Sequence, residues 1–297
     1  MLFDRQRHLL ALLDAHKGEV GNLDFQKLLF LYCQEVDEKH YEFVPYKYGG
    51  FSFTSYSDKR RLIDQGMLAN EERTWKLTES GKASATIPPL TRMKMDQFAK
   101  RHNCLRGDAL VAEAYRRYPY YAIQSEIAKR VLAGDAAALE RIKTARPVTN
   151  PEGLFTIGYE GRSLEAYLNL LLRNSVTVLC DVRRNPLSRK YGFSKGTLSK
   201  SCEGVGIRYE HLPELGIASE KRQNLDTQAD YDQLFLNYEH HSLPMQDEAL
   251  TRIQQWIAAG DRVALTCYEN LPERCHRHCV AEALEQKAGE ECTARHL

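Results

Sequence analysis

The chain has 297 residues, of which 43% are hydrophobic and 27% are charged, the ordinary usage of a globular protein. This composition excludes a mainly disordered or collagen-like chain, and no apolar run reaches the ~18 residues that predict a membrane-spanning helix. An acid and two arginines interrupt the N-terminal apolar stretch, unlike a secretion signal. We therefore expect a cytoplasmic protein with no membrane partner.

Length and charge together indicate two units. A chain of this size is expected to form about two domains. Residues 1–150 hold 24 Lys and Arg against 19 Asp and Glu, whereas residues 151–297 hold 17 against 21. A mildly basic front half and a mildly acidic back half suggest separate roles.

The first third predicts a small, mainly helical domain over residues 1–85. Apolar spacing indicates helices over 2–13, from an N-cap at Asn22 to Tyr32, and over 54–65, followed by a strand near Trp75. Three helices and then a strand pair are the order of a winged-helix unit, whose third helix would touch nucleic acid. The basic side chains on that helix are either such contacts or a solvated face: Lys59, Arg60 and Arg61.

Residues 86–150 are predicted to be a helical connector and linker. Helical patterns cover 91–101, 107–117 and 122–144. Pro147 and Pro151 then disfavour helix, so we expect the connection to the second domain there.

Residues 151–297 predict an α/β domain with a mostly parallel, Rossmann-like sheet. Apolar runs indicate strands at 154–157, 176–182, 207–209 and 263–267, and helical patterns cover 163–173, 194–203, 229–241, 246–259 and 275–287. Sites in such sheets lie beyond the carboxyl ends of the strands. This rule selects the loops 158–162, 181–195, 211–222 and 267–278.

The loop after the second strand is strongly basic. Residues 183–200 contain six basic side chains and no acid, which would attract a phosphate or another anion beside helix N-termini. Asp181 closes a buried strand and needs a cationic partner, for which Arg183 and Arg184 are nearest. The alternative is a solvated loop. The predicted anion-binding side chains here are Asp181, Arg183, Arg184, Ser188, Lys190 and Lys195.

The loop after the last apolar strand gathers three of the eight cysteines. We expect Cys275 to lie in the first turn of a helix, where backbone N–H groups and nearby arginines would favour its thiolate. Cys275 or Cys267 would then be a nucleophile or redox thiol, with His276 to activate it and Glu269 to transfer protons.

The alternative interpretation of the same segment is a metal site, in which the cysteines are ligands and not nucleophiles. Cys275 and Cys279 are four residues apart, and Cys267, His276 or His278 could add ligands. The C-x7-C-x3-C spacing matches no common zinc pattern, so we predict no metal and name no cofactor.

The loop after the first strand carries Glu160 between two glycines, and the sequence predicts a helix N-cap at Ser163. Its glycines allow a ligand to approach the backbone closely. No Walker-type or GxGxxG motif is present.

Four segments resemble, in order, the family called domain of unknown function 488. They are Thr156-Ile-Gly-Tyr-Glu-Gly-Arg-Ser, Asp181-Val-Arg-Arg-Asn-Pro-Leu-Ser-Arg-Lys-Tyr-Gly-Phe-Ser-Lys, Gly206-Ile-Arg-Tyr-Glu-His-Leu-Pro-Glu-Leu-Gly and Cys267-Tyr-Glu-Asn-Leu-Pro-Glu-Arg-Cys-His-Arg. The resemblance covers about 152–287 and implies a compact α/β domain with a polar cleft shared by the motifs, but no established reaction. The family-like positions are Gly158, Tyr159, Glu160, Asp181, Arg183, Pro186, Ser188, Cys267, Glu269, Cys275, His276 and Arg277.

The front domain resembles winged-helix-like modules of bacterial regulators and antitoxin-type proteins. The segments that carry this resemblance are Phe25-Gln-Lys-Leu-Leu-Phe-Leu-Tyr, Tyr46-Lys-Tyr-Gly-Gly-Phe-Ser-Phe and Lys76-Leu-Thr-Glu-Ser-Gly-Lys.

These features favour an enzyme, a transferase or a hydrolase, that acts on a nucleotide or nucleic-acid substrate. The basic loop 183–195, with Tyr159 and Arg277, would hold phosphate, and Cys267, Glu269, Cys275, His276 and Glu160 would carry the chemistry. One alternative is a non-enzymatic DNA-binding regulator or defence-type protein whose C-terminal domain senses an anionic ligand or a partner. Another is a structural or metal-stabilised adaptor. The oligomeric state is left open.

Overall fold

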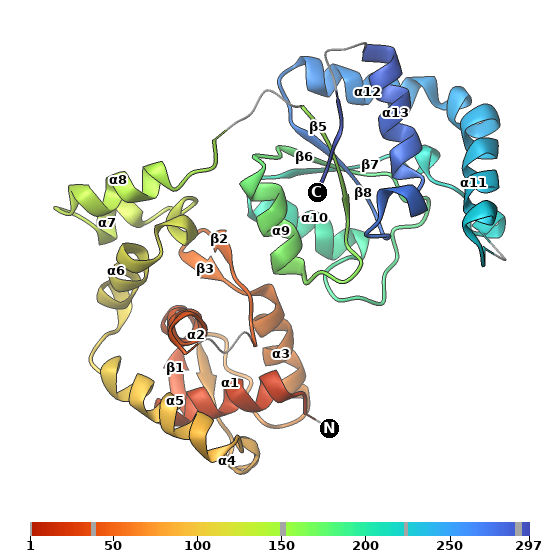
Figure 1. The fold of residues 1–297 in the computed structure, drawn as a ribbon. Coiled ribbons are helices and arrows are strands. Elements are labelled where there is room, and N and C mark those ends of the chain that lie inside the picture. The colour runs from red at the N-terminus through yellow and green to blue at the C-terminus, as the bar shows by residue number, and fades with distance from the viewer. Residues whose placement is uncertain (1, 37–39, 149–152, 223–224, 289–292) are drawn as a thin grey trace. The chain divides into compact units, whose positions relative to one another are not determined.

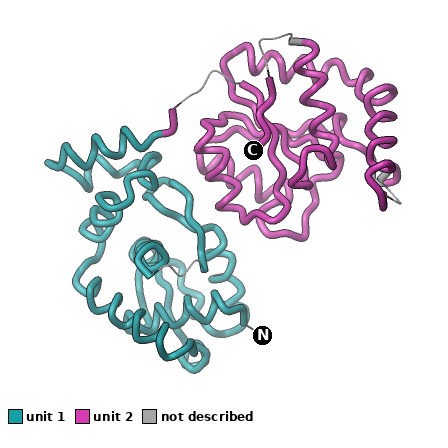
Figure 2. Tube along the Cα trace, viewed as in Figure 1, with its two compact units in different colours: residues 1–146 teal, residues 147–297 magenta. Residues whose placement is uncertain are grey.

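The computed structural model describes residues 2–36, 40–148, 153–222, 225–288 and 293–297. It divides into two compact units, residues 1–146 and residues 147–297 (Figure 2). Each unit has an apolar core of its own, so we describe each separately. None of the helices within these ranges is long and apolar enough to cross a membrane.

The first unit is mainly helical, with two small antiparallel sheets (Figure 1). One sheet pairs β1 (Glu19–Gly21) with β4 (Thr74–Lys76), and the other is the hairpin of β2 (Val44–Tyr46) and β3 (Gly49–Phe51). The helices are α1 (Asp4–Ala15), α2 (Asn22–Glu35), α3 (Phe53–Asp64), α4 (Glu79–Ser84), α5 (Pro89–Arg101), α6 (Gly107–Arg117), α7 (Ala128–Val131) and α8 (Ala136–Thr144).

The helices of the predicted connector belong to this unit. Met95 and Phe98 of α5 and Leu110 and Val111 of α6 are fully buried in the same core as α1 and α2. The hairpin of β2 and β3 stands between α2 and α3, so the element order is not three helices followed by a strand pair. Gly21, not Asn22, is the N-cap of α2, because the Asn22 side chain instead donates to the carbonyl of Glu72.

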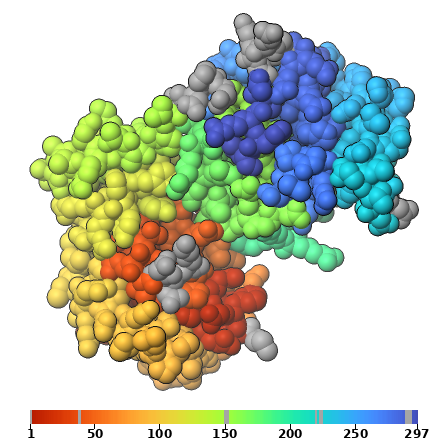
Figure 3. Space-filling model, in the orientation of Figure 1, coloured from red at the N-terminus to blue at the C-terminus, as the bar shows by residue number. Residues whose placement is uncertain are grey.

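The second unit is built on a parallel sheet, as the sequence predicts, and this sheet has five strands where four were predicted. Its strand order is β7-β6-β8-β5-β9, with β5 (Leu154–Gly158), β6 (Val178–Asp181), β7 (Arg208–His211), β8 (Val263–Cys267) and β9 (Arg295–His296). The short edge strand β9 carries no apolar run, and the sequence analysis missed it. Figure 3 shows the C-terminal residues at the surface, in agreement with the exposed side chains of Arg295 and His296.

Helices cover both faces of this sheet. Alternate strand side chains, including Val178 and Leu265, pack with α11 (Gln228–Asn237), α12 (Asp247–Ala258) and α13 (Arg277–Ala288). On the opposite face, Tyr167 of α9 (Leu164–Arg173) donates a hydrogen bond to Thr266 of β8. The helix α10 (Lys195–Gly204) precedes β7. Ser163 caps α9 by accepting from the N–H of Ala166, which confirms the predicted N-cap.

The register brings three strand ends to one edge of the sheet. Gly158 of β5 lies opposite Cys267 of β8, and Asp181 of β6 lies opposite Thr266 of β8. The loops that follow β5, β6 and β8 therefore meet at the carboxyl edge, where sites of parallel sheets are found.

Candidate functional site

A cleft of about 360 Å³ opens at this carboxyl edge. Residues of all three loops line it, together with one residue that follows β7. The lining residues are Tyr159, Arg183, Arg184, Asn185, Leu187, Ser188, Arg189, Ile217, Cys267, Tyr268, Glu269 and His276. Seven of them are among the thirteen residues predicted as catalytic or anion-binding, so the structure brings about half of that predicted site to the cleft.

A buried ion pair forms the floor between β6 and its loop. Asp181 is fully buried, and the Arg183 guanidinium binds its carboxylate through Nε at 2.8 Å and Nη2 at 2.5 Å. Tyr209 donates to the same carboxylate at 2.6 Å. Burial disfavours the charge of Arg183, but the hydrogen bond and charge of Asp181 outweigh it and raise the pKa of Arg183. Asp181 thus has the cationic partner that the sequence required.

Arg183 also orders an aromatic wall of the cleft. Its Nη1 donates to the Tyr159 hydroxyl at 3.0 Å and to the carbonyl of Phe193 at 2.9 Å. The Tyr159 ring stacks on Phe193 with centroids 4.4 Å apart. These bonds engage Nε, Nη1 and Nη2 of Arg183, which was predicted to bind an anion and whose side chain also lines the cleft.

The other predicted basic side chains lie in different surroundings. Lys190 donates to the carbonyl of Tyr159 at 3.0 Å, and burial lowers the pKa of Lys190. Lys195 contacts Nδ1 of His211 at 3.1 Å. Neither is among the lining residues of the cleft. Arg184 and Arg189 are exposed and do line it, so they are the guanidinium groups best placed to meet an anion.

The chemical centre of the cleft is a cluster around Cys267. The Cys267 thiol lies 3.8 Å from Nδ1 of His276 and 3.4 Å from a carboxylate oxygen of Glu269. Nε2 of His276 faces the carbonyl of Val182 at 3.0 Å. Because a carbonyl only accepts, Nε2 carries a hydrogen, and Nδ1 is the ring nitrogen that faces the thiol.

Cys275 differs from the sequence expectation. The helix α13 begins at Arg277, and Cys275 precedes it with its N–H bonded to the carbonyl of Pro272. Its thiol is fully buried, and burial together with the neighbouring Cys267 thiol raises the pKa of Cys275. The expectation of a thiolate favoured by a helix N-terminus is therefore wrong, and Cys267 is the thiol that lines the cleft.

Arg277 and Glu160 hold the loop after β8. Arg277 is buried and donates to the carbonyls of Glu269 at 2.5 Å and Asn270 at 2.9 Å, so it positions Glu269. Glu160 accepts from the N–H of Asn270 at 3.0 Å and is not a lining residue of the cleft. Gly158 makes the close crossing possible, because a Cβ there would lie 1.8 Å from the carbonyl oxygen of Glu269.

In the first unit, the predicted nucleic-acid residues separate into two kinds. Lys59 is buried, donates to Asn22 and to the carbonyls of Glu71 and Thr74, and lies over the Trp75 ring. It is committed to the interior and is not available to nucleic acid, which corrects the prediction. Arg60 and Arg61 are exposed on α3.

Two groups of side chains in the described part of the second unit offer metal-ligand atoms within 4.8 Å of one another. One is Cys267, Cys275 and His276, which belongs to the cleft, and the other is Glu239, His278 and Cys279. Cys267 and Cys275 take part in the first group and Cys279 in the second, a division that the linear spacing did not reveal.

Several lining residues were not predicted individually. Arg189 lay within the predicted basic loop, and its guanidinium charge was the available signal. Ile217 lies in the loop after β7, which the strand-end rule selected without naming that residue. Tyr209 does not line the cleft, and only the register of β7 against β6 brings it near Asp181.

Comparison with known proteins agrees with this architecture. The sequence model of the family described as domain of unknown function DUF488 matches residues 163–284, in the C-terminal half of the chain. No curated protein and no solved structure gives a match.

Proposed function

We propose that the second unit is an enzyme that acts on a phosphate-bearing nucleotide or nucleic-acid substrate. The observation that carries the proposal is the Cys267 thiol, which has two proton acceptors, His276 Nδ1 at 3.8 Å and Glu269 at 3.4 Å, inside a cleft rimmed by arginines. A thiol beside an oriented imidazole is the arrangement of nucleophilic catalysis.

The anion preference is supported by the charge of the rim. Arg184 and Arg189 are exposed guanidinium groups that line the cleft, and guanidinium groups bind phosphate through two parallel hydrogen bonds. Among the lining residues of the cleft, Glu269 is the one with an acidic side chain. A substrate anchored by its phosphate at the arginines would place its reacting atom toward Cys267.

The chemistry follows from the hydrogen-bond pattern. Cys267 passes its proton to His276, and the thiolate forms a bond to the electrophilic atom of the substrate as the bond to the leaving group breaks. The proton then goes to the leaving group. Water, deprotonated by Glu269, releases the product in a hydrolase, whereas a second acceptor does so in a transferase. Arg183 holds the loop after β6 in place for these steps, and Arg277 holds the loop after β8.

The test measures turnover and anion binding in the full-length protein. Mass spectrometry measures the conversion of a panel of nucleotides and short DNA and RNA oligonucleotides to products. Calorimetry measures the binding of pyrophosphate. Cys267→Ser and Glu269→Gln are expected to lower turnover at least about 100-fold while pyrophosphate still binds. Arg184→Ala with Arg189→Ala is expected to weaken pyrophosphate binding at least about tenfold.

The matched control is Lys200→Ala, which removes an exposed charge from the same basic segment but not from the cleft lining. It is expected to change neither binding nor turnover. Full activity in Cys267→Ser would refute the thiol mechanism, and equal loss of binding in the control and the arginine variants would refute the phosphate site.

A second candidate is a DNA-binding regulator that contacts DNA through its first unit, and the exposed Arg60 and Arg61 on α3 favour it. Duplex binding by the full chain should then fall with salt and weaken in Arg60→Ala with Arg61→Ala, but not in Lys143→Ala on α8. Salt-independent binding, or equal effects of the two changes, would count against this candidate.

A further inference from the structure

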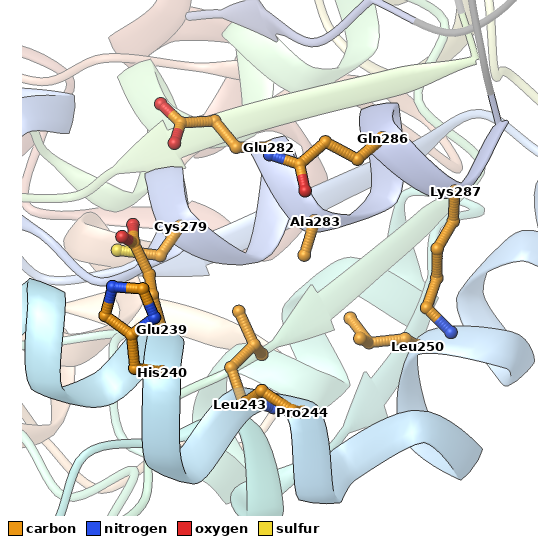
Figure 4. A pocket seen from close by; sticks show the side chains of 10 residues that line it. All are labelled: Glu239, His240, Leu243, Pro244, Leu250, Cys279, Glu282, Ala283, Gln286 and Lys287. Carbon is orange, nitrogen blue, oxygen red and sulfur yellow. The ribbon is translucent and has the colours of Figure 1, made fainter.

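A second cavity in the C-terminal unit lies between α12, α13 and the segment after α11, and it has a volume of about 460 Å³. At one end of it the side chains of Glu239 and Cys279 lie together, next to His240 (Figure 4). The proposed enzymatic mechanism uses none of these residues.

Two elements converge at that end. Cys279 and His278 lie in the first turn of α13, and Glu239 lies in a short π-helix, Tyr238–Ser242, that continues α11. A π-turn inside a helix often marks a functional site, because it changes which side chains face a given direction. One ligand atom from each of the three residues lies within 4.8 Å of the others.

The hydrogen bonds of His278 leave one ring nitrogen free to act as a ligand. Its Nδ1 faces the carbonyl oxygens of Cys275 at 2.7 Å and Pro272 at 3.0 Å. Because both partners only accept, Nδ1 carries a hydrogen toward them, so Nε2 is the ring nitrogen that can bind an ion. A backbone carbonyl behind one ring nitrogen is the usual support of a metal-binding histidine.

The second ring nitrogen of His278, Nε2, lies next to the Cys279 thiol. Nε2 of His278 lies 3.4 Å from Sγ of Cys279, and that thiol is almost fully buried. Tetrahedral zinc, with bonds of about 2.0–2.1 Å to nitrogen and about 2.3 Å to sulfur, holds two such ligands about 3.6 Å apart. The two atoms are thus already near the separation that one ion requires.

We propose that Glu239, His278 and Cys279 bind one Zn²⁺ ion, with a water molecule from the cavity as the fourth ligand. Thiolate, imidazole and carboxylate together suit zinc better than magnesium or calcium, which prefer oxygen ligands. The cavity provides an entry path, and Glu282, also on its lining, adds negative charge that attracts a cation.

Binding would join the segment after α11 to the start of α13. Cys275, His276 and Arg277 lie immediately before or at that start, so the ion would brace the helix that carries part of the proposed catalytic cluster. The zinc site itself is separate from the cleft and does not depend on the proposed function.

The test uses full-length protein stripped with chelator, reloaded with Zn²⁺ alone and dialysed. Elemental analysis gives the stoichiometry, and competition with a chromophoric chelator gives the affinity. Cys279→Ser and His278→Gln should each lose one zinc per chain relative to the unsubstituted protein. Their affinities should fall by more than the 10–100-fold that changes outside the ligand set cost.

A conservative third variant separates loss of a ligand from misfolding, and two controls test whether the effect is specific to the three proposed ligands. Glu239→Gln keeps the shape of a half-buried side chain, so it should fold normally and bind zinc at least about tenfold more weakly. The controls Cys104→Ser and His241→Gln remove an exposed thiol and an exposed imidazole outside the group and should leave zinc content unchanged.

Two results would overturn the proposal. One is a protein that holds no zinc after reloading. The other is full zinc content in Cys279→Ser with loss in Cys267→Ser, because the ion would then occupy the cleft cluster. Cobalt substitution separates the same possibilities, since the sulfur-to-metal absorption band should vanish in Cys279→Ser and persist in Cys267→Ser.

Discussion

At the scale of single residues, buried charges in this chain fall into two classes. Asp181 and Arg183 are buried as a pair, with a tyrosine hydroxyl on the carboxylate and another on the guanidinium. Lys27 is also buried, but its ammonium donates to the carbonyl of Gly50 at 2.9 Å. Complete burial lowers the pKa of Lys27 from 10.5 to about 7. Asp181 and Arg183 stabilise each other's charge, whereas the hydrogen bond of Lys27 goes to a neutral carbonyl, so Lys27 makes the stability of the first unit depend on pH.

The direction of that dependence follows from proton linkage. Between pH 7 and 10.5 the unfolded chain holds a proton on Lys27 that the folded chain lacks, so the contribution of Lys27 to the free energy of unfolding rises with pH. Lys27→Met removes this contribution. We expect it to stabilise the protein by about 3 kcal/mol more at pH 7 than at pH 10.

Denaturant unfolding at the two pH values, followed by the fluorescence of the buried Trp75, measures the difference. Comparison with the unsubstituted protein at each pH cancels the titration of all other groups. A stability change that is equal at pH 7 and pH 10 would mean that Lys27 stays charged in the folded protein.

At the scale of elements, the site depends on how closely the loop after β8 crosses the end of β5. The Gly158→Ala methyl group would meet the carbonyl oxygen of Glu269 at 1.8 Å, and backbone cannot move aside as a flexible side chain can. We expect Gly158→Ala to destabilise the protein by about 1–3 kcal/mol and to displace Glu269 from Cys267. Thermal unfolding measures the first effect, and turnover on the substrate panel measures the second.

Gly196→Ala is the matched control. Gly196 lies in the first turn of α10 with open space around its missing Cβ, so the substitution should be neutral or stabilising by up to about 1 kcal/mol. Equal destabilisation by the two substitutions would show that loss of backbone freedom, not the crossing at Gly158, determines the effect.

The elements themselves follow the sequence where apolar periodicity is strong. The strands that end at Asp181 and Cys267 and the helix capped by Ser163 lie where apolar runs and capping predict them. Prediction failed where a 3-10 turn precedes the helix. Cys275 follows the turn Pro272–Arg274 with an extended backbone, φ −141° and ψ 126°, so α13 starts two residues late and Cys275 lies outside its first turn.

The sequence predicted which residues form the site better than it predicted the contacts that each side chain makes. Charge and position after a strand selected Arg183 and Arg277, but nothing in the linear pattern says that their guanidinium groups bind Asp181 and the backbone of Glu269 and Asn270. The exposed Arg184 and Arg189 carry the same charge. Only the packing of the loops decides which of the guanidinium groups that line the cleft are buried in hydrogen bonds and which are exposed.

At the scale of the whole molecule, the apolar cores decide how the chain divides. The residues of one core run from Leu9 to Ile142, and those of the other from Leu154 to Leu284. The sequence placed the connector helices outside the first domain. Their amphipathic faces could be recognised, but the periodicity of a helix does not say which core its apolar face joins.

Two separate cores predict two separable folding units. We expect limited proteolysis to cut the chain near the boundary between Arg146 and Pro147 and to leave two fragments that resist further digestion, because each keeps its own core. Mass spectrometry identifies the fragments, and circular dichroism tests whether each remains folded. Zinc and pyrophosphate binding should both remain with the C-terminal fragment, since every ligand proposed for them lies beyond residue 147. A C-terminal fragment that unfolds on release would show that its core needs the first unit for stability.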